Sequence, residues 1–140
     1  MADEPTQLTR AATEGLRRLI DGPPSVERLS AALRHLAKWR SAVIDNTLAA
    51  REGTGVLDGP FKGMAYPVRA AEGARAARLL GVYEASLEPV IETIIARPYA
   101  TVVDIGCAEG YYAVGLARRM GHTQVLAQDV SDEAQALCRK

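Results

Sequence analysis

The chain of 140 residues is long enough for one domain, and its hydrophobic content of 48% and charged content of 24% are ordinary for a globular protein. Seventeen basic and seventeen acidic residues cancel, so no overall field attracts nucleic acid or an anionic membrane. The two cysteines lack metal-ligand spacing, which argues against a disulfide scaffold and against any metal site.

The N-terminal region, residues 1–56, is predicted to be helical. It begins MADEPTQLTR, which is acidic and polar rather than a secretory signal, and no apolar run approaches the roughly 20 residues that span a bilayer. We therefore expect a cytoplasmic protein without a membrane partner. Apolar residues at helical spacing predict helices over 6–21 and 25–52, the second capped by Ser25 and carrying a stripe that includes Leu29, Leu33 and Leu36. These amphipathic helices are candidates for a homo-oligomer contact.

Residues 57–98 are expected to lead into the core. The stretch VLDGPFKGMAYP predicts a small hairpin or an irregular loop, which could serve as a lid or as a surface connection. Helices follow over 70–80, capped by Gly81, and over 83–96. Pro89 lies inside the second helix, which predicts either a kink or a start nearer residue 88.

Residues 99–140 have the pattern of a β-α-β-α unit. A β-branched run over 101–105 predicts a buried parallel strand, and helical patterns cover 111–120 and 132–140, the latter capped by Ser131. A second strand is predicted over 125–127, just before Asp129. The fold class is therefore α/β, with a helical region before the sheet.

The stretch VVDIGCAEGYY, residues 102–112, is predicted to bind a nucleoside. Glycines after a strand allow a tight turn and close approach of a ligand, and the following helix presents free N–H groups. Ligands of open α/β sheets bind at the carboxyl ends of the strands, where Gly106 to Gly110 would lie. Asp129 ends the next strand, in position to accept hydrogen bonds from both hydroxyls of a ribose.

The details of this loop argue against the common phosphate-binding loops. A dinucleotide loop would carry a third glycine where Tyr111 stands, and the acids Asp104 and Glu109 would repel a pyrophosphate. No Gly-Lys-Ser/Thr follows, which excludes a P-loop. An acidic loop instead suits an adenosine ligand with a positive centre, and S-adenosylmethionine (SAM) has one in its sulfonium and α-amino group.

VVDIGCAEG resembles motif I of the class I SAM-dependent methyltransferases, with Ala108 in place of the middle glycine. Together with GPFKGMAY and LLGVYEASLEPVIETII, residues 59–138 resemble a bacterial, FkbM-like group of that family. The resemblance implies that Asp104 orients the methionine part, that the loop wraps it and that Asp129 holds the ribose. The implied cofactor-binding residues are Asp104, Gly106, Cys107, Ala108, Glu109, Gly110 and Asp129. Tyr83 and Glu84 would lie beside the cofactor pocket, unless Glu84 caps a helix.

The resemblance also implies a Rossmann-like sheet of which the chain holds only the first β-α-β-α. We therefore interpret the chain as the N-terminal part of a methyltransferase and expect it alone to bind SAM weakly and to transfer nothing. The methyl acceptor and the catalytic residues are not predicted. Two alternatives stay open: a helical interaction module on a Rossmann-like scaffold, and a dinucleotide oxidoreductase, which Tyr111 disfavours.

Overall fold

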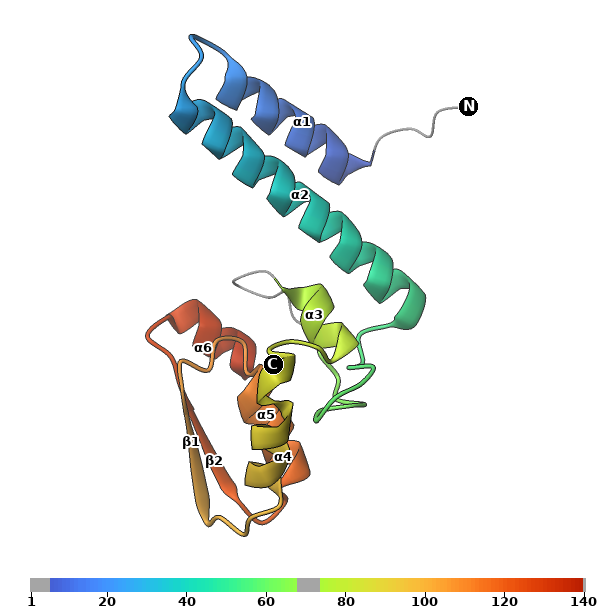
Figure 1. Cartoon of the computed structure of the whole chain (residues 1–140), viewed down its shortest axis with the longest axis vertical. Coiled ribbons are helices and arrows are strands. Elements are labelled where there is room, and N and C mark those ends of the chain that lie inside the picture. Colours follow the sequence, from blue (N-terminus) through green and yellow to red (C-terminus); the bar gives the residue numbers. More distant parts are fainter. Residues whose placement is uncertain (1–5, 68–73, 140) are drawn as a thin grey trace. The chain divides into compact units, whose positions relative to one another are not determined.

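The computed structural model describes residues 6–67 and 74–139, so the expected first turn of the helix over 70–80 lies outside the described residues. The chain forms two compact units, residues 1–47 and 48–140, and the boundary between them lies within a long helix (Figure 1). Among the described helices, none is long and apolar enough to cross a membrane.

The first unit is a helical hairpin formed by α1 (Gln7–Ile20) and the larger part of α2 (Val26–Glu52). Both expected helices are confirmed within one residue or two. The Ser25 hydroxyl caps α2 by accepting a hydrogen bond from the Arg28 N–H at 3.2 Å, as the sequence predicts. His35 Nε2 bonds the Ala12 carbonyl oxygen at 2.8 Å, which joins the two helices.

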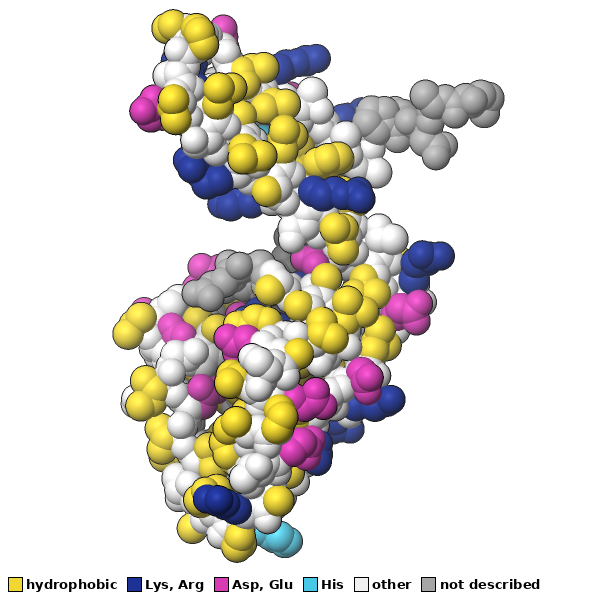
Figure 2. Space-filling model, in the orientation of Figure 1, with side chains coloured by type: hydrophobic (Ala, Val, Ile, Leu, Met, Phe, Trp, Pro, Cys, Tyr) yellow, Lys and Arg dark blue, Asp and Glu magenta, His cyan; other side chains and the backbone are white. Residues whose placement is uncertain are grey.

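The leucine stripe of α2 is not the face that α1 covers. Helix α1 packs against the face that carries Ala32 and Trp39, and the Trp39 indole N–H donates to the Thr9 hydroxyl at 3.3 Å. Leu29 and Leu33, one turn apart on another face, are 64% and 70% exposed. Hydrophobic side chains accordingly gather on the surface of the hairpin (Figure 2).

The second unit contains the expected β-α-β-α order. Its elements are α3 (Arg75–Leu80), η1 (Ala85–Leu87), α4 (Glu88–Ile95), β1 (Thr101–Ile105), α5 (Tyr111–Arg119), β2 (Gln124–Gln128) and α6 (Asp132–Cys138). The two strands pair in parallel from Thr101 opposite Gln124 to Ile105 opposite Gln128. The described residues are therefore compatible with an α/β fold, although two strands are too few to establish a Rossmann-like sheet.

The glycine- and proline-rich segment 54–67 is part of the core rather than a lid or a surface connection. An antiparallel bridge joins Gly55 to Ala65, and the N–H groups of Val56 and Tyr66 donate to the Met64 and Thr54 carbonyls on either side of it, so the expected small hairpin is found, closed by an irregular loop. Its Phe61 ring is 1% exposed and packs against α5 at Gly115, where an added Cβ would lie 2.5 Å from the ring. The sequence pattern missed this burial because the apolar residues of the segment follow no regular period.

The predicted helix over 83–96 begins later, as the alternative start near residue 88 foresaw. Pro89 lies in the first turn of α4, where its missing N–H has no intrahelical partner to lose. Tyr83 and Glu84 precede the short η1 and belong to neither helix. Glu84 has a left-handed backbone, with φ of 49°.

The core of the second unit lies on one face of the two strands, with α4 and α5 on that side in Figure 1. Val102 and Val125 contribute to it, whereas Val103 and Ile105 are 54% and 83% exposed on the opposite face. The expectation of a buried strand is thus wrong for one face of β1 in the described structure.

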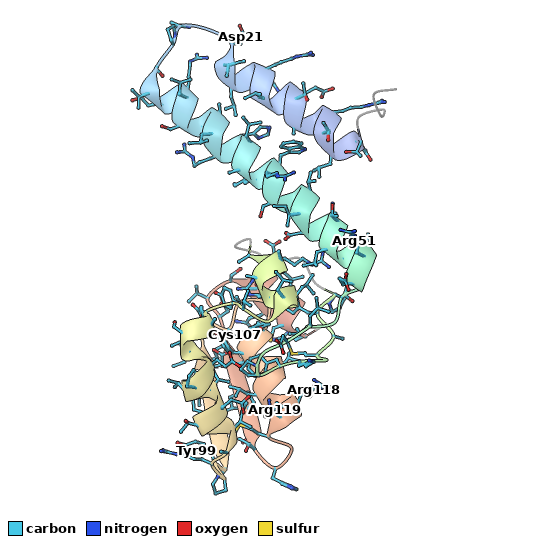
Figure 3. The ribbon with its side chains drawn as sticks, turned by 45° about the vertical axis from the view of Figure 1, so that its right-hand side comes forward. Asp21, Arg51, Tyr99, Cys107, Arg118 and Arg119 are labelled. Carbon is cyan, nitrogen blue, oxygen red and sulfur yellow. The ribbon has the colours of Figure 1, made fainter. Side chains whose placement is uncertain are left out.

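Two arginines in the last turn of α5 bind the neighbouring elements (Figure 3). Arg118 donates to the Lys62 carbonyl at 2.9 Å, and Arg119 forms an ion pair with Glu92 of α4 at 3.1 Å. These contacts hold segment 54–67 and α4 against the end of α5 that is remote from the glycine loop.

Candidate functional site

Loop 106–110 lies at the carboxyl ends of β1 and β2 and is fastened to both strands. It follows Ile105 directly, and the N–H groups of Gly106 and Cys107 donate to the Gln128 carbonyl at 2.8 and 3.0 Å. Gly106, Ala108 and Gly110 all have left-handed backbones, with φ of 83°, 45° and 91°. The backbone therefore turns sharply at every second residue between β1 and α5.

Asp129 is joined to this loop across the space between the strands. Its Oδ2 accepts a hydrogen bond from the Ala108 N–H at 2.9 Å, and its Oδ1 accepts one from the Ser131 N–H at 2.8 Å. These backbone bonds, that to Ser131 first, lower the pKa of the Asp129 carboxyl. The structure thus brings together Ala108 and Asp129, which the sequence assigned to one site.

Asp104 lies on the inner face of β1, beneath the start of α5. Burial raises the pKa of its carboxyl, the backbone N–H of Ala113 opposes that shift, and the charge of Asp129 adds to it. Its Oδ2 atom is buried and has no hydrogen-bond partner among the described residues. A buried carboxylate oxygen without a donor favours a ligand that supplies one.

Glu109 points away from the loop surface into the protein. Its side chain is fully buried, where it pairs with Arg78 of α3 and accepts a hydrogen bond from the Tyr66 hydroxyl. The Arg78 guanidinium lies 4.2 Å from the centre of the Tyr83 ring. Of the predicted cofactor-binding residues, Glu109 is therefore the one whose carboxylate is engaged in a buried network.

The partners of Glu109 are not evident in the sequence. Arg78 belongs to an alanine- and arginine-rich helix, whose arginines suggest a solvated face, and Tyr66 follows an irregular loop. The one feature of the sequence that could have indicated this network is the acidic residue itself, which lies inside a short glycine loop between a strand and a helix.

Cys107 and Cys138 lie close together behind the loop. Both are free thiols, and an added Cβ at Gly110 would lie 2.7 Å from the Cys138 sulfur. Burial, followed by the neighbouring Cys138, raises the pKa of the Cys107 thiol to about 11. Cys107 is therefore protonated at neutral pH and serves the loop through its backbone.

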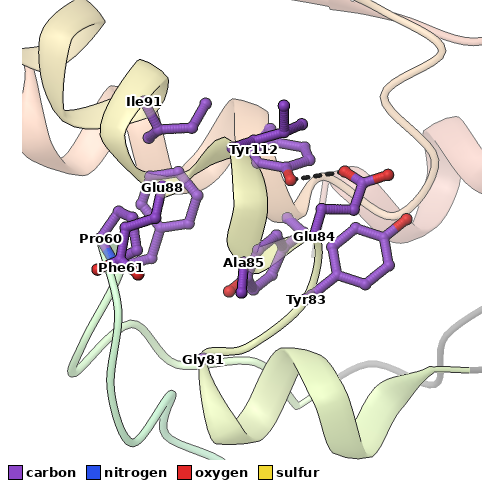
Figure 4. Close-up of a pocket in the computed structure, with 11 residues that line it drawn as sticks. Pro60, Phe61, Gly81, Tyr83, Glu84, Ala85, Glu88, Ile91 and Tyr112 are labelled. Atoms are coloured by element: carbon purple, nitrogen blue, oxygen red, sulfur yellow. Dashed lines mark hydrogen bonds between the residues drawn. The ribbon is translucent and has the colours of Figure 1, made fainter.

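A narrow cleft opens beside the first turn of α5 (Figure 4). Aromatic rings and two carboxylates contribute to its lining: Phe61, Tyr83, Tyr111, Tyr112, Glu84 and Glu88. The Tyr112 hydroxyl donates to Glu84 Oε2 at 2.6 Å. Tyr111 is buried and Tyr112 is half-buried, and both rings line the cleft.

A larger, open hollow of about 370 Å³ lies at the opposite end of the strands. It is lined by residues 95–100 and 119–123, which precede β1 and β2. Parallel sheets bind their ligands at the carboxyl ends, so the loop rather than this hollow is the candidate site.

The charges around loop 106–110 restrict the ligand. Asp104 and Asp129 are both acidic, which disfavours a phosphate at the loop and favours a group that carries hydroxyls or positive charge. In the part of the chain that the structure describes, no three His, Cys, Asp or Glu side chains are grouped to hold a metal ion. Comparisons with protein families, with curated proteins and with solved structures found no match to this chain.

Proposed function

We propose that loop 106–110, with Asp104 and Asp129, binds SAM, and that the chain is the cofactor-binding part of a SAM-dependent methyltransferase. The observation that carries this proposal is the convergence of the two acids on one glycine loop at the carboxyl ends of parallel strands. The same convergence would be unfavourable for a pyrophosphate.

The residues present fit this cofactor. The buried Oδ2 of Asp104 lacks a donor within the described structure, and the ammonium group of the methionine part would supply one, directly or through water. Asp129 would exchange its bond to Ala108 for bonds from the ribose hydroxyls. When bound, SAM supplies a methyl group activated by the positive sulfur, and this chain's residues would orient it. The acceptor of the methyl group is not assigned.

The test is a titration of the ¹⁵N-labelled chain with SAM, followed by amide shifts in NMR spectra, because this method detects the weak binding expected here. Shifts should concentrate at residues 104–110 and 129–131. Asp129→Ala should weaken binding about ten-fold or more, since a ribose hydrogen-bonded to a carboxylate loses a charged partner. Glu14→Gln, on α1, is the matched control. NAD that shifts the same amides more strongly than SAM would instead favour a dinucleotide enzyme.

A second candidate function, association through the hairpin, is favoured by one observation. Leu29 and Leu33 are more than half exposed on a face of α2 that α1 leaves open. We infer that this face contacts a second copy of the chain. Light scattering should give a solution mass above that of a monomer, and Leu33→Ser should reduce it. A monomeric wild-type protein at high concentration would contradict this inference.

A further inference from the structure

The aromatic rings that wall the cleft of Figure 4 pack against one another. The Phe61 and Tyr111 rings meet edge to face at 5.3 Å between centres, and Tyr111 and Tyr112 do so at 5.4 Å. Tyr83 packs against Tyr111 in the same manner at 5.7 Å. Faces of aromatic rings carry partial negative charge, so such walls attract cations.

The charged side chains that line the cleft are negative, like the faces of its aromatic rings. Among the described residues, its lining contains two carboxylates, Glu84 and Glu88, and no lysine or arginine. The guanidinium of Arg78 lies behind, against Tyr83, and is paired with the buried Glu109. A cation in the cleft would therefore meet two carboxylates without competition from a basic side chain of the lining.

Glu84 combines a strained backbone with a side chain that is fixed by a hydrogen bond. It is exposed, yet its backbone is left-handed, a conformation that costs a residue other than glycine about 1 kcal/mol. Its Oε2 is fixed by the Tyr112 hydroxyl, whose pKa is raised by burial and by this bond, so the hydroxyl stays a donor. Backbone strain of this kind concentrates at binding sites.

The size of the cleft limits what enters it. Its cavity volume is about 10 Å³, which accommodates one water-sized group. A primary ammonium has that size, whereas a quaternary ammonium is several times larger. An ammonium also supplies three donors, which match carboxylate oxygens and ring faces.

We propose that this cleft binds a protonated primary amine, with Glu84 as its carboxylate partner and the tyrosine rings as its walls. Two sources share this chemistry: an amine that accepts the methyl group, and the α-ammonium of the cofactor, which would then bind Glu84 in place of Asp104. Both sources rest on the proposed function, because both presuppose that the chain binds SAM. The cleft lies beside the first turn of α5, directly after the glycine loop. Binding of a simple amine does not rest on that function.

The first experiment uses methylammonium chloride as the probe, with sodium chloride at equal ionic strength as the reference, and records amide shifts of the 140-residue chain. Shifts should concentrate at residues 83–88 and 111–112. Glu84→Gln retains an oxygen to accept the Tyr112 bond but removes the charge, and should weaken binding about ten-fold. Glu14→Gln should leave it unchanged. Tetramethylammonium should bind more weakly than methylammonium.

Three results would overturn the proposal: no localised shift up to about 100 mM methylammonium, a range that covers even very weak contacts; equal binding to Glu84→Gln; or tighter binding of tetramethylammonium. Tyr112→Phe is a second variant, and it should weaken binding less than Glu84→Gln does. These results stand whether or not SAM binds.

The second experiment distinguishes the sources. SAM and 5′-methylthioadenosine, which lacks the amino-acid part, are titrated into wild type and Glu84→Gln. If only SAM loses affinity in the variant, the ammonium belongs to the cofactor. If SAM is unaffected and methylammonium still binds beside it, the amine is the acceptor. If SAM displaces no methylammonium and the variant binds both as wild type does, the proposal fails.

Discussion

Glu109 shows how one residue of a predicted binding loop can serve the fold instead of the ligand directly. Its carboxylate is buried with the Arg78 guanidinium and the Tyr66 hydroxyl, residues from α3 and from segment 54–67. A charge without a partner at this position would be costly, so the pair ties three segments to the loop. The shape of loop 106–110 therefore depends on residues that do not belong to it.

Arg78→Met should destabilise the second unit by about 3 to 5 kcal/mol, because it removes the arginine that forms an ion pair with the buried Glu109 carboxylate. Urea unfolding followed by near-ultraviolet circular dichroism of the tyrosines measures this, since all five tyrosines lie in residues 48–140. Arg119→Met is the control. It breaks a pair with Glu92 that is over a third exposed on both sides, and should cost at most about 1 kcal/mol. Equal losses for the two variants would contradict this account.

Asp104 and Asp129 respond to the fold in opposite directions. Burial raises the pKa of Asp104, so its charged form opposes folding above that pKa, and the penalty disappears as the pH falls below the unfolded value. Backbone hydrogen bonds lower the pKa of Asp129, so its charge favours folding above the unfolded value and this contribution is lost as the pH falls through the lowered pKa. The site therefore contains one destabilising acid and one stabilising acid.

Asp104→Asn should raise stability at neutral pH by about 1 kcal/mol, since relief of a strained functional site commonly has this size. Its carbonyl oxygen can retain the contact with the Ala113 N–H. The gain should shrink as the pH falls from neutral to about 4, near the unfolded value, because the raised pKa of Asp104 makes the penalty on its charged form fade as the carboxyl takes up its proton. Asp129→Asn should instead lower stability at neutral pH. Tyrosine circular dichroism in urea at both pH values measures each effect, and a less stable Asp104→Asn protein would refute the assignment.

At the scale of elements, α5 positions the site because segment 54–67 presses against it. Gly115 faces the Phe61 ring so closely that no Cβ fits between them without movement. Phe61 in turn contacts both tyrosines that open α5. The glycine in the middle of the helix thus has a packing role that outweighs its poor helix propensity.

Gly115→Ala should destabilise the second unit by about 1 to 3 kcal/mol through overpacking, although alanine favours a helix by about 1 kcal/mol. Gly121→Ala is the matched control, because an added Cβ there meets nothing within 4 Å. The urea midpoint of the tyrosine signal should fall for the first variant and stay nearly constant for the second. Because Phe61 also lines the cleft, methylammonium binding should weaken in Gly115→Ala alone. A more stable Gly115→Ala protein would contradict the overpacking, because it would show that the Phe61 ring moves aside at little cost in free energy.

At the scale of the whole molecule, local sequence signals predicted the helices and strands, whereas contacts between residues far apart in sequence could not be predicted. Caps at Ser25 and Ser131 and the β-branched run over 101–105 placed α2, α6 and β1, since these signals act within a few residues. The convergence of Asp129 on the loop followed from the parallel order of the strands. Burial of segment 54–67 and the ion pair of Glu109 could not be predicted, because they join residues far apart in sequence.

The amphipathic pattern of α2 has a related limit, since periodicity identifies an apolar stripe but not what covers it. Leu33 is 70% exposed within the hairpin, and if a second copy covers it, unfolding of the hairpin includes dissociation. Each ten-fold rise in protein concentration should then stabilise the folded dimer by about 1.4 kcal/mol, or about 0.7 kcal/mol per chain. Fluorescence of Trp39, the single tryptophan, reports this unit. Leu33→Ser should abolish the concentration dependence, whereas Leu87→Ser in the second unit should preserve it. A midpoint independent of concentration in wild type would exclude association through this stripe.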